Sequence, residues 1–379
     1  MEAGVYCYFR EITGKQGTEV LMDGRKVLMF GSNAYTGLTG DPRVEAAAKK
    51  AIDQYGTGCA GSRFLNGTLD IHVKLEKELA EFEHKDDALC FSTGFTVNSG
   101  VISVVCGRGD YIICDDRDHA SIVDGRRLSF ATCLKYKHND MGDLEEQLKK
   151  CRPEAIKLIV VDGVFSMDGN VAPMDQICDL AEKYDALVMV DESHSAGVVG
   201  PTGHGVAEQF KAYGRVDIFT GTLGKAFGGA MGGFTTGKKE IIDMLRQRSR
   251  PYLFSNSVAP AIIGASLEMF KMLKESDALH TKLMDNVNYF RDRMLAAGFD
   301  IKPTQSAICA VMLYDAKLSQ DFAAKMQEEG IYVTGFYYPV VPKGQARIRV
   351  QLSAGHEKAH LDKAIAAFIK VGKELGVIK

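Results

Sequence analysis

Short apolar runs alternate with amphipathic stretches along the first two thirds of the chain. Two of these short apolar runs, Ala186–Val190 and Val216–Thr220, have the length and composition of buried parallel strands. Similar runs open three further segments, which are 88–105, 110–125 and 157–173. Helices are predicted between them, over 41–55, 72–82 and 174–184. Strands that alternate with helices in this way predict an α/β fold.

Other parts of the chain depart from this alternation. Near the start, two β-rich runs flank Asp23-Gly24 and predict a hairpin. Segment 56–68 contains four glycines in thirteen residues and is predicted as a long structured loop. A long helix is predicted over 260–297, and short strands and helices follow it. The chain is therefore divided into an N-terminal segment, a large domain and a small α/β domain, which are 1–40, 41–258 and 259–379.

Composition narrows the class of protein. The 379 residues are 46% hydrophobic and 25% charged, with a net charge of −3, which disfavours nucleic acid or an anionic membrane as partner. No apolar run has the length of a membrane span, and Glu2 after Met1 does not begin a secretory signal. The nine cysteines include no C-x-x-C pair. We therefore expect reduced thiols, no metal site and a cytoplasmic location.

Polar side chains gather just after the two central strands. Asp191 and His194 follow the first strand, and Thr222 and Lys225 follow the second. In open α/β sheets, ligands bind beyond the carboxyl ends of the strands. An acid, an imidazole and an amine are therefore expected in one crevice.

A lysine among glycines indicates phosphate binding, either in a P-loop or in a site for a phosphorylated cofactor. A P-loop needs G-x-x-x-x-G-K-[ST], but Phe219 replaces the first glycine and Ala226 follows the lysine. Pyridoxal phosphate (PLP) needs a lysine for a Schiff base and an acid for its ring nitrogen, and Lys225 and Asp191 match these roles. From these residues alone, a surface lysine and an aspartate that caps a helix remain the alternative.

The segments VDESH (190–194) and GTLGKAFGGAMGGF (221–234) resemble the α-oxoamine synthases. These fold-type I PLP enzymes join an amino acid to an acyl thioester, and the resemblance covers nearly the whole chain. It implies a large domain with a mostly parallel seven-stranded sheet and a small C-terminal α/β domain. It also implies that Lys225 holds PLP and acts as general base. Asp191 would pair with the ring nitrogen, and His194 would donate to the phenolic oxygen.

Further motifs of the family assign the remaining site residues by resemblance. D-H-A-S-I places His119 over the PLP ring, and the strand–loop–helix at 88–105 gives the N–H groups of Gly94 and Phe95 to the phosphate. Thr222 and Ser166 are assigned to the cofactor as well. In the F-S-x-S segment, a serine reaches the phosphate of the neighbouring subunit, which implies an obligate homodimer. The candidates there are Ser255 and Ser257.

Two residues are assigned to the amino-acid substrate by the same resemblance. Asn33 belongs to the N-x-Y-x-G-L segment, and Arg349 belongs to the strand that binds the substrate carboxylate. Arg347 lies two positions away and shares a face with Arg349 in a regular strand, so both remain candidates. The family usually has a further N-terminal helical segment, and the sequence leaves open whether one precedes Met1.

The resemblance differs between the two halves of the chain. Up to about residue 170 it is densest to bacterial serine palmitoyltransferases, as in GCAGSRFLNGTLD and CDDRDHASIVDG. From about residue 180 it is densest to glycine C-acetyltransferases, as in RQRSRPYLFSNS and GIYVTGFYYPVVPKGQARIR. The expected reaction therefore joins serine, or a polar relative such as cysteate, to a long acyl chain carried by CoA or a carrier protein. The alternatives are glycine with acetyl-CoA, 8-amino-7-oxononanoate synthesis or a PLP aminotransferase. A non-catalytic paralogue is disfavoured because Lys225 is present.

Overall fold

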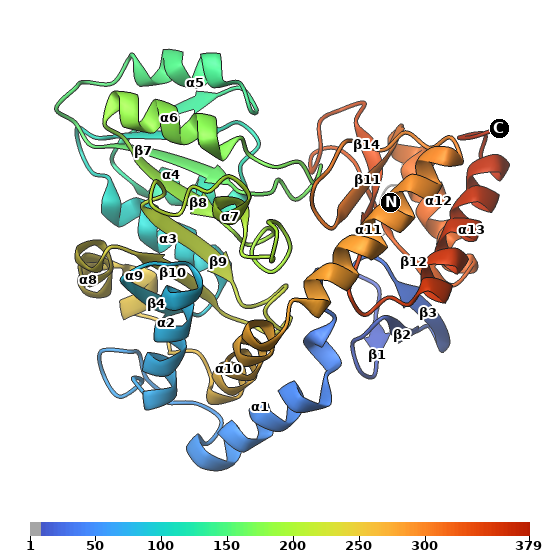
Figure 1. Cartoon of the computed structure of the whole chain (residues 1–379), viewed down its shortest axis with the longest axis horizontal. Coiled ribbons are helices and arrows are strands. Elements are labelled where there is room, and N and C mark those ends of the chain that lie inside the picture. The colour runs from blue at the N-terminus through green and yellow to red at the C-terminus, as the bar shows by residue number, and fades with distance from the viewer. Residues whose placement is uncertain (1–8) are drawn as a thin grey trace. The chain divides into compact units, whose positions relative to one another are not determined.

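The computed structural model describes residues 9–379, and its contacts divide into two units (Figure 1). The larger unit comprises Pro42–Phe165 and Val171–Ser276. The smaller unit comprises the described residues up to Asp41, the short segment Ser166–Asn170 and Asp277–Lys379. By contacts, residues 259–276 thus belong with the larger unit, whereas the sequence analysis grouped them with the C-terminal domain.

A seven-stranded sheet forms the centre of the larger unit, with strand order β4-β10-β9-β8-β7-β5-β6. Only β10 runs antiparallel to its neighbours, so the predicted α/β fold with a mostly parallel seven-stranded sheet is confirmed. The strands are β4 (Asp87–Phe91), β5 (Tyr111–Asp115), β6 (Thr132–Tyr136), β7 (Lys157–Asp162), β8 (Leu187–Asp191), β9 (Ile218–Thr222) and β10 (Gly233–Gly237).

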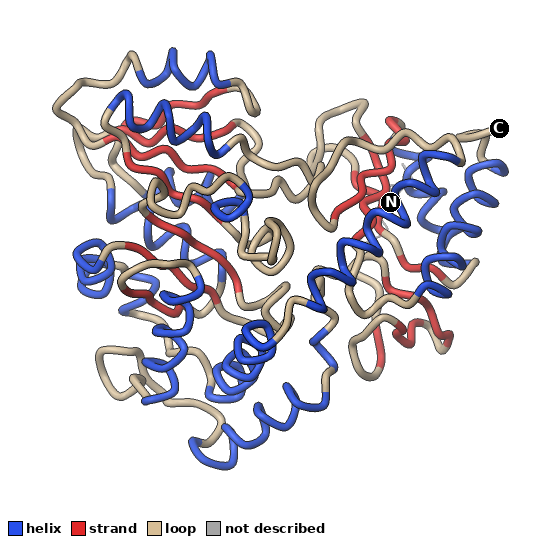
Figure 2. Tube along the Cα trace, in the orientation of Figure 1, coloured by secondary structure: helices blue, strands red, loops and turns tan. Residues whose placement is uncertain are grey.

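The larger unit also contains the helices α1 to α10 (Figure 2). They are α1 (Pro42–Tyr55), α2 (Asp70–Phe82), α3 (Gly94–Val105), α4 (Ala120–Leu128), α5 (Met141–Leu148), α6 (Met174–Tyr184), α7 (Val206–Gln209), α8 (Lys239–Arg248), α9 (Arg250–Leu253) and α10 (Pro260–Glu275). Helix α3 is buried because Val97, Val101 and Ile102 pack into the same apolar cluster as Val160 and Met189 of the central strands. The predicted helices at 41–55, 72–82 and 174–184 correspond to α1, α2 and α6.

The smaller unit contains two sheets with strand orders β1-β2-β3-β12 and β11-β14-β13. Its strands are β1 (Ile12–Thr13), β2 (Glu19–Met22), β3 (Arg25–Met29), β11 (Ile308–Tyr314), β12 (Ile331–Tyr332), β13 (Thr334–Phe336) and β14 (Ala346–Gln351). Its α-helices are α11 (Ala278–Ala296), α12 (Ala316–Glu328) and α13 (Lys358–Glu374), and a single 3-10 turn spans Leu38–Gly40. The hairpin about Asp23-Gly24 is confirmed, and both turn residues have positive φ, as a type I′ hairpin turn requires.

The predicted single helix over 260–297 is wrong, because the chain forms two helices there. Helix α10 ends at Glu275, and Ser276 is extended with φ −164° and ψ 139° before α11 begins at Ala278. Serine and aspartate bind neighbouring backbone groups outside helices and therefore favour helix ends, which the apolar pattern does not reveal. The boundary between the two units falls at this same break.

Among the described residues, no helix is both long enough and apolar enough to cross a bilayer. The glycine-rich segment 56–68 forms no helix or strand, as predicted.

Candidate active site

Lys225 and His194 lie side by side in the larger unit. Lys225 stands in the loop between β9 and β10, and its Nζ is 2.9 Å from Nε2 of His194. His194 follows the end of β8 by three residues, and β8 pairs with β9 in parallel. Because the carboxyl ends of adjacent parallel strands meet at one edge of a sheet, the amine and the imidazole come into contact there.

Asp191, the last residue of β8, is a buried carboxylate held by two donors. Its Oδ2 accepts a hydrogen bond from Nδ2 of Asn98 at 2.7 Å, and its Oδ1 accepts one from the backbone N–H of Ser193 at 2.9 Å. Both carboxylate oxygens thus act as acceptors, which fixes the orientation of the side chain. An ionised acid is what a basic ring nitrogen needs in order to keep its proton.

His119 is the N-cap residue of α4 and is fixed through both its backbone and its ring. Its backbone N–H donates to Oδ2 of Asp162 at 2.8 Å, and its Nδ1 lies 2.7 Å from Oγ of Ser121. Removal of water by the surrounding protein lowers the pKa of His119, Asp191 raises it and Lys225 lowers it. The net effect is a pKa below the usual value, which favours the neutral ring.

The N-terminus of α3 forms a cradle for an anion. Thr93 caps this helix by accepting a hydrogen bond at Oγ1 from the N–H of Thr96 at 3.1 Å, a cap that does not use the N–H groups of Gly94 and Phe95. A Cβ at position 94 would lie 2.9 Å from Cβ of Thr222, so glycine allows the helix to start close to the end of β9. Free N–H groups at a helix N-terminus bind phosphate.

The segment that contains Ser255 and Ser257 is tied to this region. The backbone N–H and the hydroxyl of Ser257 donate to the carbonyl oxygen of Gly61 at 3.3 and 3.4 Å. The hydroxyl of Ser92, two residues before α3, donates to the carbonyl oxygen of Asn256 at 3.1 Å. Ser255 is half-buried. Both candidate serines therefore belong to a segment that joins the glycine-rich loop to the start of α3.

The glycine-rich loop is anchored by a buried ion pair that the sequence analysis did not identify. Nη1 and Nη2 of Arg63 donate to the two carboxylate oxygens of Glu76 at 2.6 and 3.1 Å. Glu76 also accepts from the backbone N–H of Cys90 on β4 at 3.0 Å. This bidentate pairing fixes the loop against α2 and the sheet.

In the smaller unit, the two candidate arginines of β14 differ in their partners. Arg347 forms a buried ion pair with Asp168 and donates to the carbonyl oxygens of Gln345 and Met167 at 2.9 and 3.2 Å. Arg349 donates to Oδ1 of Asn33 at 3.1 Å, while its buried Nε has no hydrogen-bond partner among the described residues. Arg349 therefore keeps donor capacity for a ligand, and Arg347 uses its donors within the protein.

Further side chains surround Arg349. The hydroxyl of buried Tyr35 donates to Oδ1 of Asn33 at 3.4 Å, and the side chain of Gln351 lies against the same oxygen. Gln351 lies two residues beyond Arg349 on the same strand, so the two side chains share a face. The two-residue period of a strand could therefore have predicted this neighbour from the sequence. Ser166 is half-buried and belongs by contacts to this unit, next to the segment that pairs with Arg347.

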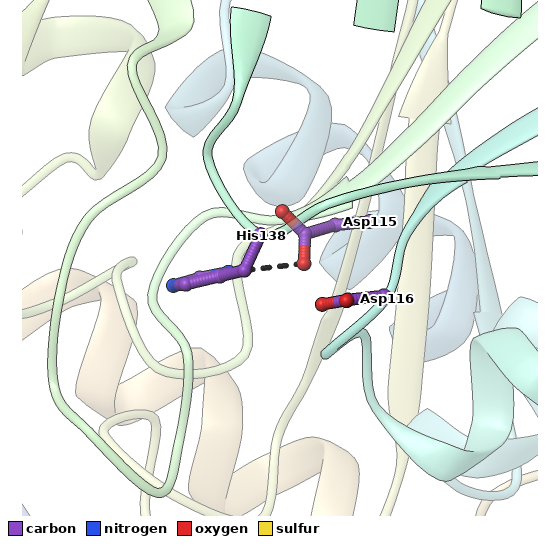
Figure 3. Close-up of side chains that lie close together, drawn as sticks. All are labelled: Asp115, Asp116 and His138. Carbon is purple, nitrogen blue, oxygen red and sulfur yellow. Dashed lines mark hydrogen bonds and ion pairs between the residues drawn. The ribbon is translucent and has the colours of Figure 1, made fainter. Parts of the chain in front are cut away.

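A group of two aspartates and a histidine, the one cluster with metal-ligand spacing among the described residues, lies elsewhere in the larger unit (Figure 3). Nδ1 of His138 lies 3.0 Å from Oδ1 of Asp115, which also accepts from the N–H of Arg117 at 2.9 Å. Oδ2 of Asp115 accepts from the N–H of Asn139 at 2.9 Å, while Asp116 is exposed. Asp115 thus holds the loop after β5 and the loop after β6 in place through hydrogen bonds.

The donors of the larger unit fit PLP. The phosphate of PLP matches the helix N-terminus at Gly94, its ring nitrogen matches Asp191, and its aldehyde matches the amine of Lys225. Thr222 lies against Gly94, and His119 is within electrostatic reach of both Asp191 and Lys225. Asn33, Ser166 and Arg349 are described with the smaller unit.

Comparisons with known proteins agree with this chemistry. The profile of the family "Aminotransferase class I and II" matches residues 25–368. The chain is 52% identical over 378 residues to the serine palmitoyltransferase of Bacteroides thetaiotaomicron. The alignment covers 100% of this chain and 96% of that protein. It is 50% identical over 378 residues to 2-amino-3-ketobutyrate coenzyme A ligase of Escherichia coli, with 99% and 95% covered. A solved structure of SPT with PLP internal aldimine has a TM-score of 0.94 and 34% identity, and covers 97% of this chain and 94% of that one.

Proposed function

Because the chain belongs to the α-oxoamine synthases of the aminotransferase class I and II family, which are PLP-dependent C-acyltransferases, we propose that it condenses serine with a long-chain acyl thioester. A serine-like polar amino acid such as cysteate is included in this proposal. The products would be a 3-keto sphingoid-type base, CO₂ and the free thiol. The observation that carries the catalytic part is the contact of Lys225 with His194 at the ends of two adjacent parallel strands.

When bound, PLP supplies an electron sink for negative charge at the α-carbon of the amino acid. In this proposal Lys225 holds the cofactor covalently through Nζ, and the freed amine later takes the α-proton as general base. His194, 2.9 Å from that amine, orients it and donates to the phenolic oxygen. Asp191 would keep a proton on the ring nitrogen of bound PLP, and His119 would shield the cofactor from water.

The phosphate and the substrate carboxylate are assigned to two other sets of donors. The N–H groups of Gly94 and Phe95, with Thr222 beside them, hold the phosphate. Arg349 binds the carboxylate of the amino acid, with Asn33 as its neighbour. The support for Arg349 is its Nε, which has no partner within residues 9–379, because a guanidinium grips a carboxylate through two parallel N–H bonds.

The proposal for serine and a long acyl chain is supported by the relative at 52% identity, whose name is serine palmitoyltransferase. The second candidate is the condensation of glycine with acetyl-CoA, supported by the ligase at 50% identity. The difference between these two identities is small, so an enzymatic measurement decides between the two reactions.

A homodimer is part of the proposal. Phe64 and Leu65 of the glycine-rich loop and Phe254 beside Ser255 are exposed apolar side chains, and the rings of Phe64 and Phe254 are 6.2 Å apart. Exposed apolar patches of this kind mark interaction surfaces. A second copy that covers this patch would bring Ser255 or Ser257 to the phosphate held by its partner.

Thioester consumption by the PLP-loaded protein tests the proposal. Serine, cysteate, glycine and alanine are each combined with palmitoyl-CoA and with acetyl-CoA, and the aminoketone is identified by mass spectrometry. Turnover of palmitoyl-CoA with serine or cysteate is expected. Turnover only of acetyl-CoA with glycine would replace the first candidate by the second. If Lys225→Ala keeps the absorbance band of covalently bound PLP, the assignment of Lys225 is wrong.

A further inference from the structure

Two polar side chains outside the assigned set connect Asp191 to His119. Nδ2 of Asn98 lies 2.7 Å from Oδ2 of Asp191 and 2.8 Å from Oγ of Ser121. Oγ of Ser121 in turn lies 2.7 Å from Nδ1 of His119. Asn98 is on α3, Ser121 is on α4, and both are buried. This series of hydrogen bonds thus runs from α3 to α4, two helices that pack on each other.

The direction of the first bonds follows from the groups at the end of the chain. A carboxylate only accepts, so the amide nitrogen of Asn98 faces Asp191. The hydroxyl of Thr220 on β9 donates to Oδ1 of Asn98 at 2.8 Å, which fixes the amide in the same orientation. The second N–H of this amide then donates to Oγ of Ser121.

The direction of the last bond follows from the two donors of Ser121, which are its hydroxyl and its backbone N–H. Oγ of Ser121 accepts from Asn98 and has its own proton to give to its other close neighbour, Nδ1 of His119. The backbone N–H of Ser121, which can only donate, lies 3.2 Å from the same nitrogen. Nδ1 therefore carries no proton, and a neutral imidazole must carry its proton on Nε2.

We propose that Asn98 and Ser121 are positioning residues that hold His119 as the neutral tautomer protonated on Nε2. Nε2 of His119 has no hydrogen-bond partner among the described residues, so the ring offers a donor to a bound group. This inference rests on the proposed function and adds to it that the carboxylate of the amino acid accepts a hydrogen bond from Nε2 of His119. The other neutral tautomer would present a lone pair to that carboxylate and repel it. The same series of hydrogen bonds links the orientation of His119 to Asp191, the acid proposed for the ring nitrogen.

Nitrogen NMR of the PLP-loaded protein, labelled with ¹⁵N only in histidine, measures this tautomer directly. His119→Gln identifies the signals of His119 by their loss. The wild type is expected to show an unprotonated Nδ1 and a protonated Nε2 at neutral pH. Ser121→Ala, which removes one oxygen atom, is expected to raise the fraction of the Nδ1-protonated form. Asn98→Asp is expected to raise it further, because the new carboxylate accepts the proton of Ser121 and leaves Oγ to accept from the ring.

Ser99→Ala is the matched control, since Ser99 lies on the same helix and its hydroxyl donates to the carbonyl oxygen of Phe95 at 3.2 Å, outside the chain. It is expected to leave the tautomer unchanged. In Ser121→Ala, KM for the amino acid is expected to rise about five- to tenfold, the loss of roughly one hydrogen bond, with unchanged PLP content.

Protonation of Nδ1 in the wild type would overturn the inference. An unchanged tautomer ratio in Ser121→Ala would also overturn it, even if Asn98→Asp does not fold. The tautomer is measured without substrates, so its outcome is separate from that of the proposed function. If the tautomer is as expected and no thioester is consumed, the proposed function fails and the hydrogen-bond assignment stands.

Discussion

Arg347 and Arg349 are two positions apart on one strand, and they differ in how many of their N–H groups have hydrogen-bond partners. Arg347 has its donors engaged by Asp168 and two carbonyl oxygens, whereas Arg349 keeps a buried Nε that has no partner in the described part of the chain. A buried donor without a partner costs free energy unless a ligand or water satisfies it. The residue that leaves such a donor open is therefore the better candidate for a ligand contact, and sequence alone contains no information on this.

Substitution of each arginine by lysine tests that difference. Arg349→Lys is expected to raise KM for the amino acid about 10- to 100-fold, because an ammonium cannot replace a bidentate grip on a carboxylate. Arg347→Lys is the matched control and is expected to lower the melting temperature while KM changes little. Steady-state kinetics and thermal unfolding measure both effects. Equal increases of KM in the two variants would show that the hydrogen-bond partners of the two arginines do not distinguish their roles.

At the scale of elements, periodicity predicted the regular structure and the ends of strands predicted the main chemistry. Asp191, His194 and Lys225 were proposed because each follows an apolar run, and strand ends face a common edge. Asn98 and Thr220 were not found, because they lie in the middle of elements and meet Asp191 only through the sheet topology. The fold class was thus readable from local pattern, whereas the buried network was not.

Two further misses have the same kind of cause. The break at Ser276 interrupts an apolar pattern that continues on both sides, so periodicity alone predicts one helix. The pair of Arg63 and Glu76 joins a loop to a helix across thirteen positions, a distance at which charge patterning carries no signal.

The connection between β14 and α13 contains a buried histidine that makes the smaller unit sensitive to acid. Nδ1 of His356 accepts from the N–H of Ser353 at 3.1 Å, Nε2 lies 2.9 Å from the carbonyl oxygen of Met29, and the ring stacks on Phe30 at 4.1 Å. Burial lowers the pKa of His356 to about 4. The unfolded chain therefore binds a proton on this residue at a higher pH than the folded chain does.

Stability is expected to fall as the pH decreases from about 6.5, the usual pKa of histidine, towards about 4. The contribution is largest above about pH 6.5 and amounts to about 3 kcal/mol when fully expressed. Denaturant unfolding at several pH values measures it, and His356→Gln is expected to give a flatter profile over this range. His280→Gln, a half-buried histidine of the same unit, is the control and should keep the slope. A wild-type slope that survives in His356→Gln would assign the effect to other groups.

At the scale of the whole molecule, the proposed homodimer depends on the apolar patch formed by Phe64, Leu65 and Phe254. Phe64→Ser combined with Phe254→Ser is expected to weaken self-association at least about tenfold, since exposed aromatic side chains often dominate interfaces and about 1.4 kcal/mol changes affinity tenfold. Light scattering during size-exclusion chromatography over a dilution series measures this. PLP content should fall with the dimer if Ser255 or Ser257 reaches the partner's phosphate.

Phe130 supplies the control for that experiment, because it is 73% exposed, close to the 74% of Phe254, and stacks only with Arg108 in the described structure. Phe130→Ser should leave the association and the PLP content unchanged. If the double variant associates like the wild type, the patch is not the interface. Loss of PLP at undiminished association would instead place the effect within one chain, because Ser257 ties the glycine-rich loop to the segment beside the phosphate cradle.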